Sequence, residues 1–154
     1  MLEDGLIASP GCMLALAVGG KSHAGLDTSN TRVTNNLATR FGINNANEPT
    51  LTYDHNVALS NYQPFVHFVN GAWNFGTPLG VTDAAGNVSF KTSQNYAEQF
   101  VAWNPAALSF NLMLKPLSVA IGPATATGAP TVDILGVKRA APPSATVGAY
   151  SYPR

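Results

Sequence analysis

Apolar residues recur at every second position in several short segments of this chain, and Gly, Pro or Asn separates most of these segments. A period of two places alternate side chains on opposite faces of a β-strand. Phe110, Leu112 and Leu114 are the clearest example of this spacing. The pattern and the strand-favouring residues predict strands over residues 64–70, 107–114, 117–121, 131–137 and 146–152.

Residues 81–91 carry the strongest local signal. Val, Thr, Ser and Phe side chains, which favour strands, flank a turn that contains Asp83, Gly86 and Asn87. Glycine adopts positive φ without steric cost, and Asp and Asn side chains hydrogen-bond the backbone of a turn. This segment is therefore expected to form a β-hairpin.

Helical spacing is limited to two segments. Val33, Leu37 and Phe41 recur every four residues, and Gly42 follows as a helix stop, which predicts one short helix there. Residues 93–103 fit both helical spacing and a strand, so the sequence leaves the structure of this segment open.

These elements together predict a mainly β fold, an antiparallel β-sandwich or barrel-like domain with at most one or two short helices. Prolines concentrate in residues 116–154, which are expected to form extended segments joined by turns. A disordered linker is the alternative, but apolar residues such as Val132 and Leu135 favour order. We therefore expect a β-rich core domain with an N-terminal arm over residues 1–115. An extended Pro/Ala/Gly-rich C-terminal arm over residues 116–154 would pack on the core or on a neighbour.

Charged residues make up 10% of the chain, against about 25% in an ordinary soluble domain. Asp83 is the only formal charge between residues 55 and 90, and Lys115 is the only one between residues 99 and 132. Long stretches therefore lack the side chains that usually keep a surface solvated. We interpret this as a surface built to be covered by other copies of the chain or by another protein.

The formal net charge is zero at pH 7, and the largest basic cluster is the pair Lys138 and Arg139. A chain without a long-range positive field is not expected to bind nucleic acid directly. Cys12 is the only cysteine, which excludes an internal disulfide framework.

No signal peptide or transmembrane segment is expected. Glu3 and Asp4 occupy the place where a signal peptide carries positive charge. The longest apolar passage, residues 106–121, is interrupted by polar residues and Pro116, whereas a membrane helix needs about 20 apolar residues. We expect synthesis in a cytoplasm.

Residues 15–22 resemble a relaxed phosphate-binding loop, because Gly19, Gly20 and Lys21 precede Ser22. The true motif follows a buried strand and opens an amphipathic helix, whereas a polar stretch with a glycine follows here. A strand followed by a Gly-Gly turn explains the segment better, so no nucleotide or other cofactor is expected.

The residues available for metal or acid–base chemistry are His23, His55, His67, Asp27, Asp54 and Asp83. Gly25 argues against the helix that would bring His23 and Asp27 together, and the remaining residues show no ligand spacing. A nucleophile elbow, a Cys-x-x-Cys pair and a close carboxylate pair outside the N-terminus are all missing from the sequence. We expect neither a metal site nor an enzyme. Lys21 and His55 are the residues whose replacement would test for turnover.

Trp73, Trp103 and Tyr53 offer a possible platform for a neutral sugar, since an aromatic face with nearby amide groups binds carbohydrate. Both tryptophans follow Ala and precede Asn at expected strand ends, a position that favours packing over the core. A carbohydrate- or receptor-binding β module on a surface or tail structure remains the alternative function.

A β-rich, charge-poor chain fits a structural subunit of a large assembly, most directly a bacteriophage capsid, capsid-decoration or other virion protein. Such a protein acts through contacts with its own copies and with a major shell or tube protein, and resides in the virion after synthesis in the host cytoplasm. The residues expected at these interfaces are Phe65, Val66, His67, Phe68, Trp73, Phe75, Trp103, Tyr150 and Tyr152.

Overall fold

The structure is a computed structural model that describes residues 15–18, 32–44, 50, 52–59, 65–69, 72–75, 82–90, 95–142 and 145–152. Strands dominate this part of the chain, and its one helix, α1 (Tyr96–Gln99), has four residues. The protein is therefore mainly β, as the alternation of apolar residues predicted. The strands are β1 (Ala15–Val18), β2 (Arg32–Thr34), β3 (Leu37–Ala38), β4 (Arg40–Asn44), β5 (Thr52–Asp54), β6 (Val57–Ala58), β7 (Phe65–Val69), β8 (Ala72–Phe75), β9 (Val88–Ser89), β10 (Phe100–Asn104) and β11 (Ser109–Leu114).

Most pairs among the described strands are parallel, which corrects the expectation of antiparallel pairing. β4 pairs with β1 and β7, β2 with β5, and β6 with β3 and β9, all in parallel. Among the described strands, only β7 with β8 and β10 with β11 are antiparallel. The reason is that consecutive strands here meet at corners instead of folding back through hairpins, so each strand pairs with its equivalent in the next coil.

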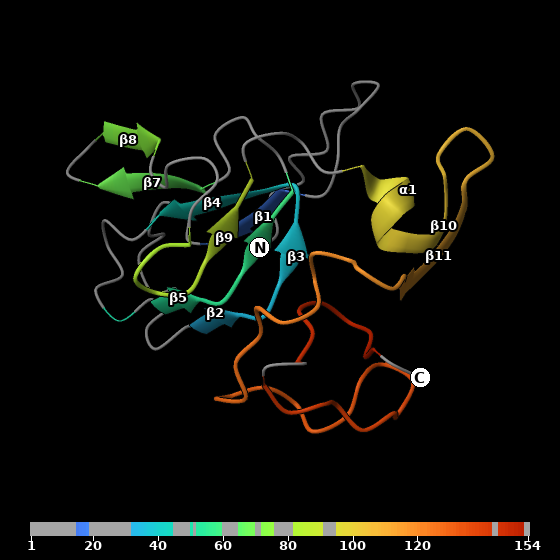
Figure 1. Cartoon of the computed structure of the whole chain (residues 1–154). Helices are drawn as coiled ribbons and strands as arrows, with labels where there is room; N and C mark the ends of the chain where they lie inside the picture. Colours follow the sequence, from blue (N-terminus) through green and yellow to red (C-terminus); the bar gives the residue numbers. More distant parts are fainter. Residues whose placement is uncertain are drawn as a thin grey trace, which may run out of the picture.

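The chain winds as a short stack of coils (Figure 1). One coil contains β2, β3 and β4, the next contains β5, β6 and β7, and a third contributes β9. The register aligns Leu37 with Val57 and Val57 with Val88. This arrangement is of the parallel β-helix type, in which each coil buries its interior against its neighbours. The described strands form no closed barrel.

The interior of the stack is filled by equivalent residues from successive coils. Phe41 and Phe65 are fully buried, and their rings stack with centroids 5.2 Å apart and an interplanar angle of 11°. Val57 and Leu59 are also buried, but in a second cluster that includes Phe100, Leu114 and Val147 from the later part of the chain. Stacking one coil on the next therefore removes large apolar side chains from water, which is the main stabilising contribution to such a fold.

The helix predicted around Val33, Leu37 and Phe41 is wrong. These three residues lie in β2, β3 and β4, respectively, and Gly42 lies inside β4. Corners between the short strands, such as Asn35 with φ of 58°, interrupt the strand period of two. The resulting spacing of four between inward-facing residues has the same period as one helical turn.

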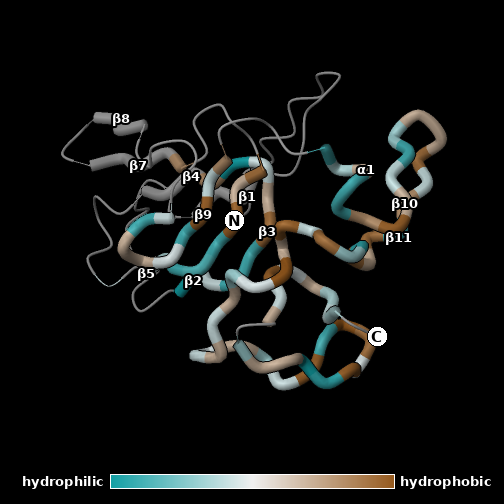
Figure 2. Tube along the Cα trace, viewed as in Figure 1, coloured by the Kyte–Doolittle hydropathy of each residue, from teal (hydrophilic) through white to brown (hydrophobic). Residues whose placement is uncertain are grey.

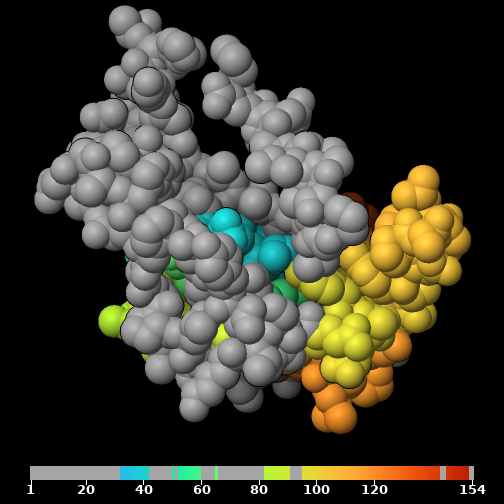
Figure 3. Space-filling model, turned by 90° about the horizontal axis from the view of Figure 1, so that it is seen from above, coloured from blue at the N-terminus to red at the C-terminus, as the bar shows by residue number. Residues whose placement is uncertain are grey.

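The segment that the sequence left open contains both elements. The side chain of Asn95 caps α1 by accepting from the Ala97 N–H, and the helix ends at Phe100, where the backbone is extended. β10 then begins and forms an antiparallel hairpin with β11, which bears out the strand predicted near residues 107–114. In Figure 3 this hairpin appears as a yellow-to-orange projection at the edge of the molecule.

Of the other predicted strands, the one over residues 64–70 is present as β7. The predicted hairpin at residues 81–91 is reduced to a tight turn with a single antiparallel bridge between Thr82 and Val88. Val88 then enters β9, which pairs in parallel with β6.

Residues 116–142 and 145–152 form turns and isolated bridges where three strands were expected. Bridges join Ile121 to Thr146 and Val132 to Lys138. Ala120, Ala124 and Val147 are buried in the same cluster as Val57. This C-terminal segment therefore packs against the coil stack, and Figure 1 shows it in orange to red beside β2 and β3. Contact of this segment with a neighbouring molecule stays a prediction.

Candidate functional site

A column of three asparagines joins the coils at one corner. The backbone N–H and the Nδ2 of Asn36 both donate to Oδ1 of Asn56, at 3.1 Å each. Asn56 repeats this pattern, donating from its backbone N–H and Nδ2 to Oδ1 of Asn87 at 3.0 and 2.9 Å. Asn56 and Asn87 are fully buried. We call Asn36, Asn56 and Asn87 the asparagine ladder.

The ladder also satisfies backbone carbonyls that the corners leave unpaired. Nδ2 of Asn56 donates to the Val33 carbonyl at 3.0 Å, and Nδ2 of Asn87 donates to the Tyr53 carbonyl at 3.3 Å. Buried polar groups cost free energy unless they are paired. The ladder is therefore a structural device that holds the coils in register.

A residue with left-handed backbone precedes each ladder asparagine. Asn35 has φ of 58°, His55 has φ of 52° and Gly86 has φ of 77°. A Cβ built on Gly86 would lie 2.9 Å from Nε2 of His55. Glycine at this position is therefore favoured by the backbone conformation, which Asn35 and His55 also adopt, and by the histidine ring packed against it.

Asp83 closes one end of the ladder. Its Oδ1 accepts from the backbone N–H groups of Ala85 and Asn87 at 2.9 and 2.8 Å, and its Oδ2 accepts from Nδ2 of Asn87 at 3.1 Å. This aspartate, considered above for metal or acid–base chemistry, thus acts as the cap of a turn.

The sequence carries a signal for the ladder that strand and helix patterns do not detect. Asn-Leu-Ala, Asn-Val-Ala and Asn-Val-Ser occur at residues 36–38, 56–58 and 87–89, each after a left-handed residue. The first two asparagines are 20 residues apart and the next two are 31 apart. Because the interval is unequal, a search for a fixed repeat period misses the motif.

A second polar cluster surrounds Asp54. Arg32 donates from Nε and Nη2 to its two carboxylate oxygens at 3.0 Å each, and Thr34 donates from Oγ1 at 2.7 Å. His55 Nδ1 lies 3.1 Å from Asp54 Oδ1. Burial acts to raise the pKa of Asp54, but these hydrogen bonds and the Arg32 charge outweigh it, so the pKa lies below its ordinary value.

The arrangement around Asp54 is that of a surface ion pair between neighbouring coils. His23, Asp27 and Lys21 lie outside the described residues, and the side chain of His67 is also outside them. No group of three His, Cys, Asp or Glu residues gathers within the part of the chain that the structure describes. β1 occupies residues 15–18 of the loop-like motif, and the rest of that motif is not described.

Large apolar side chains project from the β10–β11 hairpin and the turns that follow it. Leu108 is 81% exposed with φ of 49°, and Leu117 is 96% exposed with φ of 68°. Left-handed backbone favours Gly or Asn and is unusual for leucine. Figure 2 shows further hydrophobic positions along the C-terminal segment. The other exposed large apolar residues are Val101, Phe110, Leu112, Val132, Ile134 and Leu135.

Trp103 lies in an aromatic cluster of the same hairpin, where it is paired with Phe110 near the loop. Its ring stacks on Tyr96 and Phe100, with centroids 5.0 and 5.8 Å apart, and meets Phe110 at 5.0 Å in a tilted arrangement. A tryptophan with this many ring contacts is poorly placed as an open sugar platform. Tyr53 is half-buried and packs against the cluster that contains Phe41.

The predicted interface residues fall into different environments. Phe65 is fully buried in the stack, so it is a core residue in this structure. Trp103, Tyr150 and Tyr152 are half-buried, and Tyr152 packs against the main core cluster. The remaining residues belong to β7 and β8, whose side chains at Val66, His67, Phe68, Trp73 and Phe75 lie outside the description.

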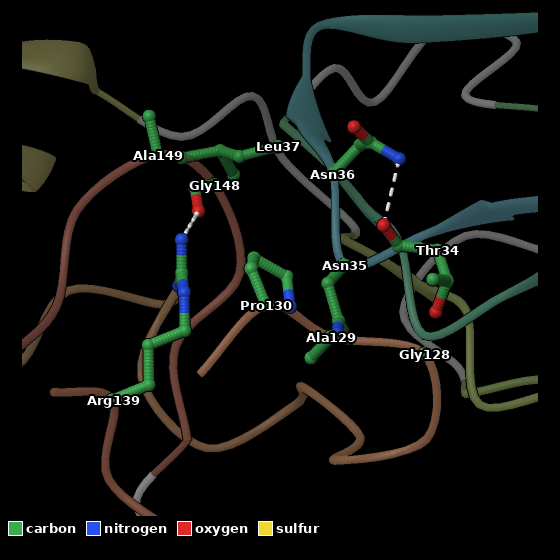
Figure 4. A pocket seen from close by; sticks show the side chains of 10 residues that line it. All are labelled: Thr34, Asn35, Asn36, Leu37, Gly128, Ala129, Pro130, Arg139, Gly148 and Ala149. Atoms are coloured by element: carbon green, nitrogen blue, oxygen red, sulfur yellow. Dashed lines mark hydrogen bonds between the residues drawn. The ribbon is translucent and has the colours of Figure 1, made fainter. Parts of the chain in front are cut away.

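A pocket of about 390 Å³ lies between the corner that joins β2 to β3 and the C-terminal segment (Figure 4). Arg139 at its edge donates to the carbonyls of Val132, Thr146 and Gly148 at 3.3, 3.3 and 2.9 Å. These bonds tie the wall of the pocket together. The lining residues are Thr34, Asn35, Asn36, Leu37, Gly128, Ala129, Pro130, Arg139, Gly148 and Ala149.

No family model matches this chain, and neither a curated protein nor a solved structure matches it. Within the described residues, no helix is long and apolar enough to span a membrane.

Proposed function

We propose that this chain is a structural subunit of a large assembly, a virion protein such as a bacteriophage capsid or capsid-decoration subunit, which acts through protein–protein contacts and not through catalysis. Its partners in this proposal are other copies of itself and a major shell or tube protein. The observation that carries the proposal is the pair of exposed leucines, Leu108 and Leu117, in left-handed turns.

Leu117 occupies a position where folding by itself favours another residue. The Ser118 N–H donates to the Lys115 carbonyl at 3.2 Å across a turn with Pro116 and Leu117 at its centre. Leu117, the second central residue, has φ of 68°, as in a type II turn, where Gly or Asn is preferred. Leucine here strains the backbone and leaves an apolar side chain in water, which fits a side chain that is covered by a partner in an assembly.

Leu108 presents the same combination at the tip of the β10–β11 hairpin, where its N–H donates to the Pro105 carbonyl at 3.3 Å. Lys115 is the only formal charge from residue 99 to residue 132, and its Nζ donates to the Ala97 carbonyl at 2.7 Å. A surface with few charges loses little hydration free energy when a partner covers it. The hairpin and the turn after it therefore suit a protein contact.

The test is the oligomeric state of the double variant Leu108→Asn, Leu117→Gly. We expect the natural chain to be oligomeric, or to precipitate, in sedimentation velocity experiments at rising concentration, and the double variant to remain monomeric. Thr127→Asn, at an exposed position in another turn, is the matched control and should behave like the natural chain. A natural chain that stays monomeric at high concentration and fails to co-purify with virus particles would refute the proposal.

A further inference from the structure

Two turns of the chain, residues 83–87 and 133–137, share one hydrogen-bond pattern and the sequence Asp-x-x-Gly. In each turn the aspartate N–H donates to the carbonyl four residues later, at 3.0 and 2.8 Å, and the glycine N–H donates to the aspartate carbonyl at 3.0 Å. In each turn Oδ1 of the aspartate accepts from the N–H groups two and four residues later, at 2.8 or 2.9 Å. The two glycines, Gly86 and Gly136, have φ of 77° and 78°. The chain therefore builds the same turn twice.

The two turns differ at their middle positions. The first turn has Ala84 and Ala85, whereas the second has Ile134 and Leu135, which are 67% and 58% exposed. Alanine satisfies the same backbone geometry in the first turn, so the turn itself does not require the two large apolar side chains. Their exposure to water costs free energy in the isolated chain, which a protein partner would recover by covering them.

The second turn is fixed in place before any partner binds. Asp133 is 5% exposed, and its Oδ2 accepts from the Ser151 N–H at 3.0 Å. The Ile134 N–H donates to the Ala149 carbonyl at 3.0 Å. Both bonds hold the turn against residues 149–151. A side chain presented on a rigid turn loses less conformational freedom when it is bound than one on a mobile loop.

The charges around this turn are positive. Asp133 is the only acidic residue after Glu98, and its buried carboxylate accepts backbone N–H groups. Lys138 is exposed, and its side chain makes no hydrogen bond or ion pair within the described residues. Residues 99–154 contain four basic residues and one acidic residue, a formal charge of +3, whereas residues 1–98 contain four basic and seven acidic residues, a formal charge of −3. The two parts of the chain are therefore complementary in charge.

We propose that Ile134 and Leu135 anchor a head-to-tail contact between two copies of this chain. In this contact the turn and Lys138 of one copy bind the acidic region, residues 1–98, of the next copy. Charge complementarity favours this occupant, because a two-fold contact would bring the positive turn of each copy against the same turn of the other. Contacts between unlike surfaces leave one surface of each kind free at every step, so further copies can add to the assembly.

The first test compares self-association of the natural chain with that of the double variant Ile134→Ala, Leu135→Ala, which copies the middle of the first turn. Sedimentation velocity at rising concentration should give a dissociation constant at least tenfold higher for the double variant. Its thermal unfolding should match that of the natural chain, because the first turn folds with alanines. Thr127→Asn, exposed in another turn, is the control and should associate normally. Equal association of the natural chain and the double variant would overturn the inference.

The second test concerns charge. At an ionic strength of about 0.1 M, where charges interact over about 10 Å, Lys138→Glu should weaken association at least threefold, and Lys138→Arg should leave it unchanged. At about 1 M, where this distance falls to about 3 Å, the Lys138→Glu variant and the natural chain should associate equally. Association of Lys138→Glu as strong as that of the natural chain at the lower ionic strength would exclude an acidic partner surface.

The third test identifies the occupant. With p-benzoylphenylalanine in place of Ile134, irradiation of the full chain should give a covalent dimer. Mass spectrometry of its peptides should show a cross-link from position 134 to residues 1–98 of the second copy. A cross-link to residues 99–154 of the second copy would overturn the inference, and so would cross-linking to a different protein alone in assembled particles.

The inference rests on the proposed function, because the partner is another copy of the chain, but the two fail separately. If the natural chain assembles or is found in virus particles while the turn variant associates as strongly as the natural chain, only this inference fails. If the chain associates through the turn as expected but occurs in no virus particle, only the virion proposal fails.

Discussion

Asn56 and Asn87 are both fully buried, and Oδ1 of Asn87 accepts two hydrogen bonds from Asn56, at 3.0 Å from the backbone N–H and at 2.9 Å from Nδ2. These bonds connect residues 31 positions apart in the sequence. A buried amide that is fully paired specifies one register, because any shift between coils would leave several polar groups unpaired at once.

Replacing Asn56 should therefore destabilise the fold strongly. Asn56→Ala leaves the Asn36 N–H and the Val33 carbonyl without the partners they have here. With unpaired buried groups costing about 1–3 kcal/mol each, we expect a loss of about 2–4 kcal/mol in the free energy of unfolding. Urea denaturation followed by circular dichroism measures it. Asn104→Ala, which removes an exposed hydrogen bond to the Ala107 N–H, is the control and should cost less than about 1 kcal/mol.

Gly86→Ala tests the corner geometry. The added methyl would require left-handed backbone and would lie 2.9 Å from the His55 ring, so we expect a loss of about 1–3 kcal/mol. Gly136→Ala, at φ of 78° with open space around it, measures the backbone cost alone.

The steric part of the Gly86 effect is separable in the double variant. In a His55→Ala background the methyl group meets no ring, so Gly86→Ala should cost less there than in the natural chain. Thermal unfolding of the natural chain, the two single variants and the double variant gives the coupling free energy between positions 55 and 86. Equal costs in the two backgrounds would show that the His55 contact contributes nothing.

Leu117→Gly separates a role in assembly from a role in folding. Removing leucine from a left-handed position relieves strain, so we expect the monomer to keep its stability or gain about 1 kcal/mol. Self-association should weaken in the same variant. Differential scanning calorimetry and light scattering measure the two effects, and a loss of stability with unchanged association would contradict the contact role assigned to this residue.

Stability should fall in acid because of Asp54. Its pKa is lowered in the folded chain, since burial raises the pKa but hydrogen bonds from Arg32, Thr34 and His55 outweigh burial. The stabilisation is thus complete above the unfolded value of about 3.9 and is lost as the pH falls through the lower folded pKa. Urea unfolding at several pH values between 5 and 2 should show that the free energy of unfolding declines. The decline should be smaller in Asp54→Asn. An unchanged pH profile in Asp54→Asn would exclude this carboxylate as the source.

The local properties of the chain follow from its sequence. Alternating residues such as Phe110 and Leu112 predict strands, and Asp83 with Gly86 predicts a turn, because these preferences depend on neighbours within a few positions. The low charge content is also evident from the sequence. Together with the exposed Leu117, it supports the proposal that part of the surface contacts another protein.

Tertiary structure alone decided how those strands pair and where the asparagines meet. Alternation shows which residues of a strand share a face but not which strand lies next to it, so the sequence did not show that β4 pairs with β1 and β7. The spacing of Val33, Leu37 and Phe41 predicted a helix. In the structure, corners between short strands produce this spacing, and the three residues lie in β2, β3 and β4. Asn36, Asn56 and Asn87 are far apart along the chain, and only the stacking of coils brings their amides within hydrogen-bond distance.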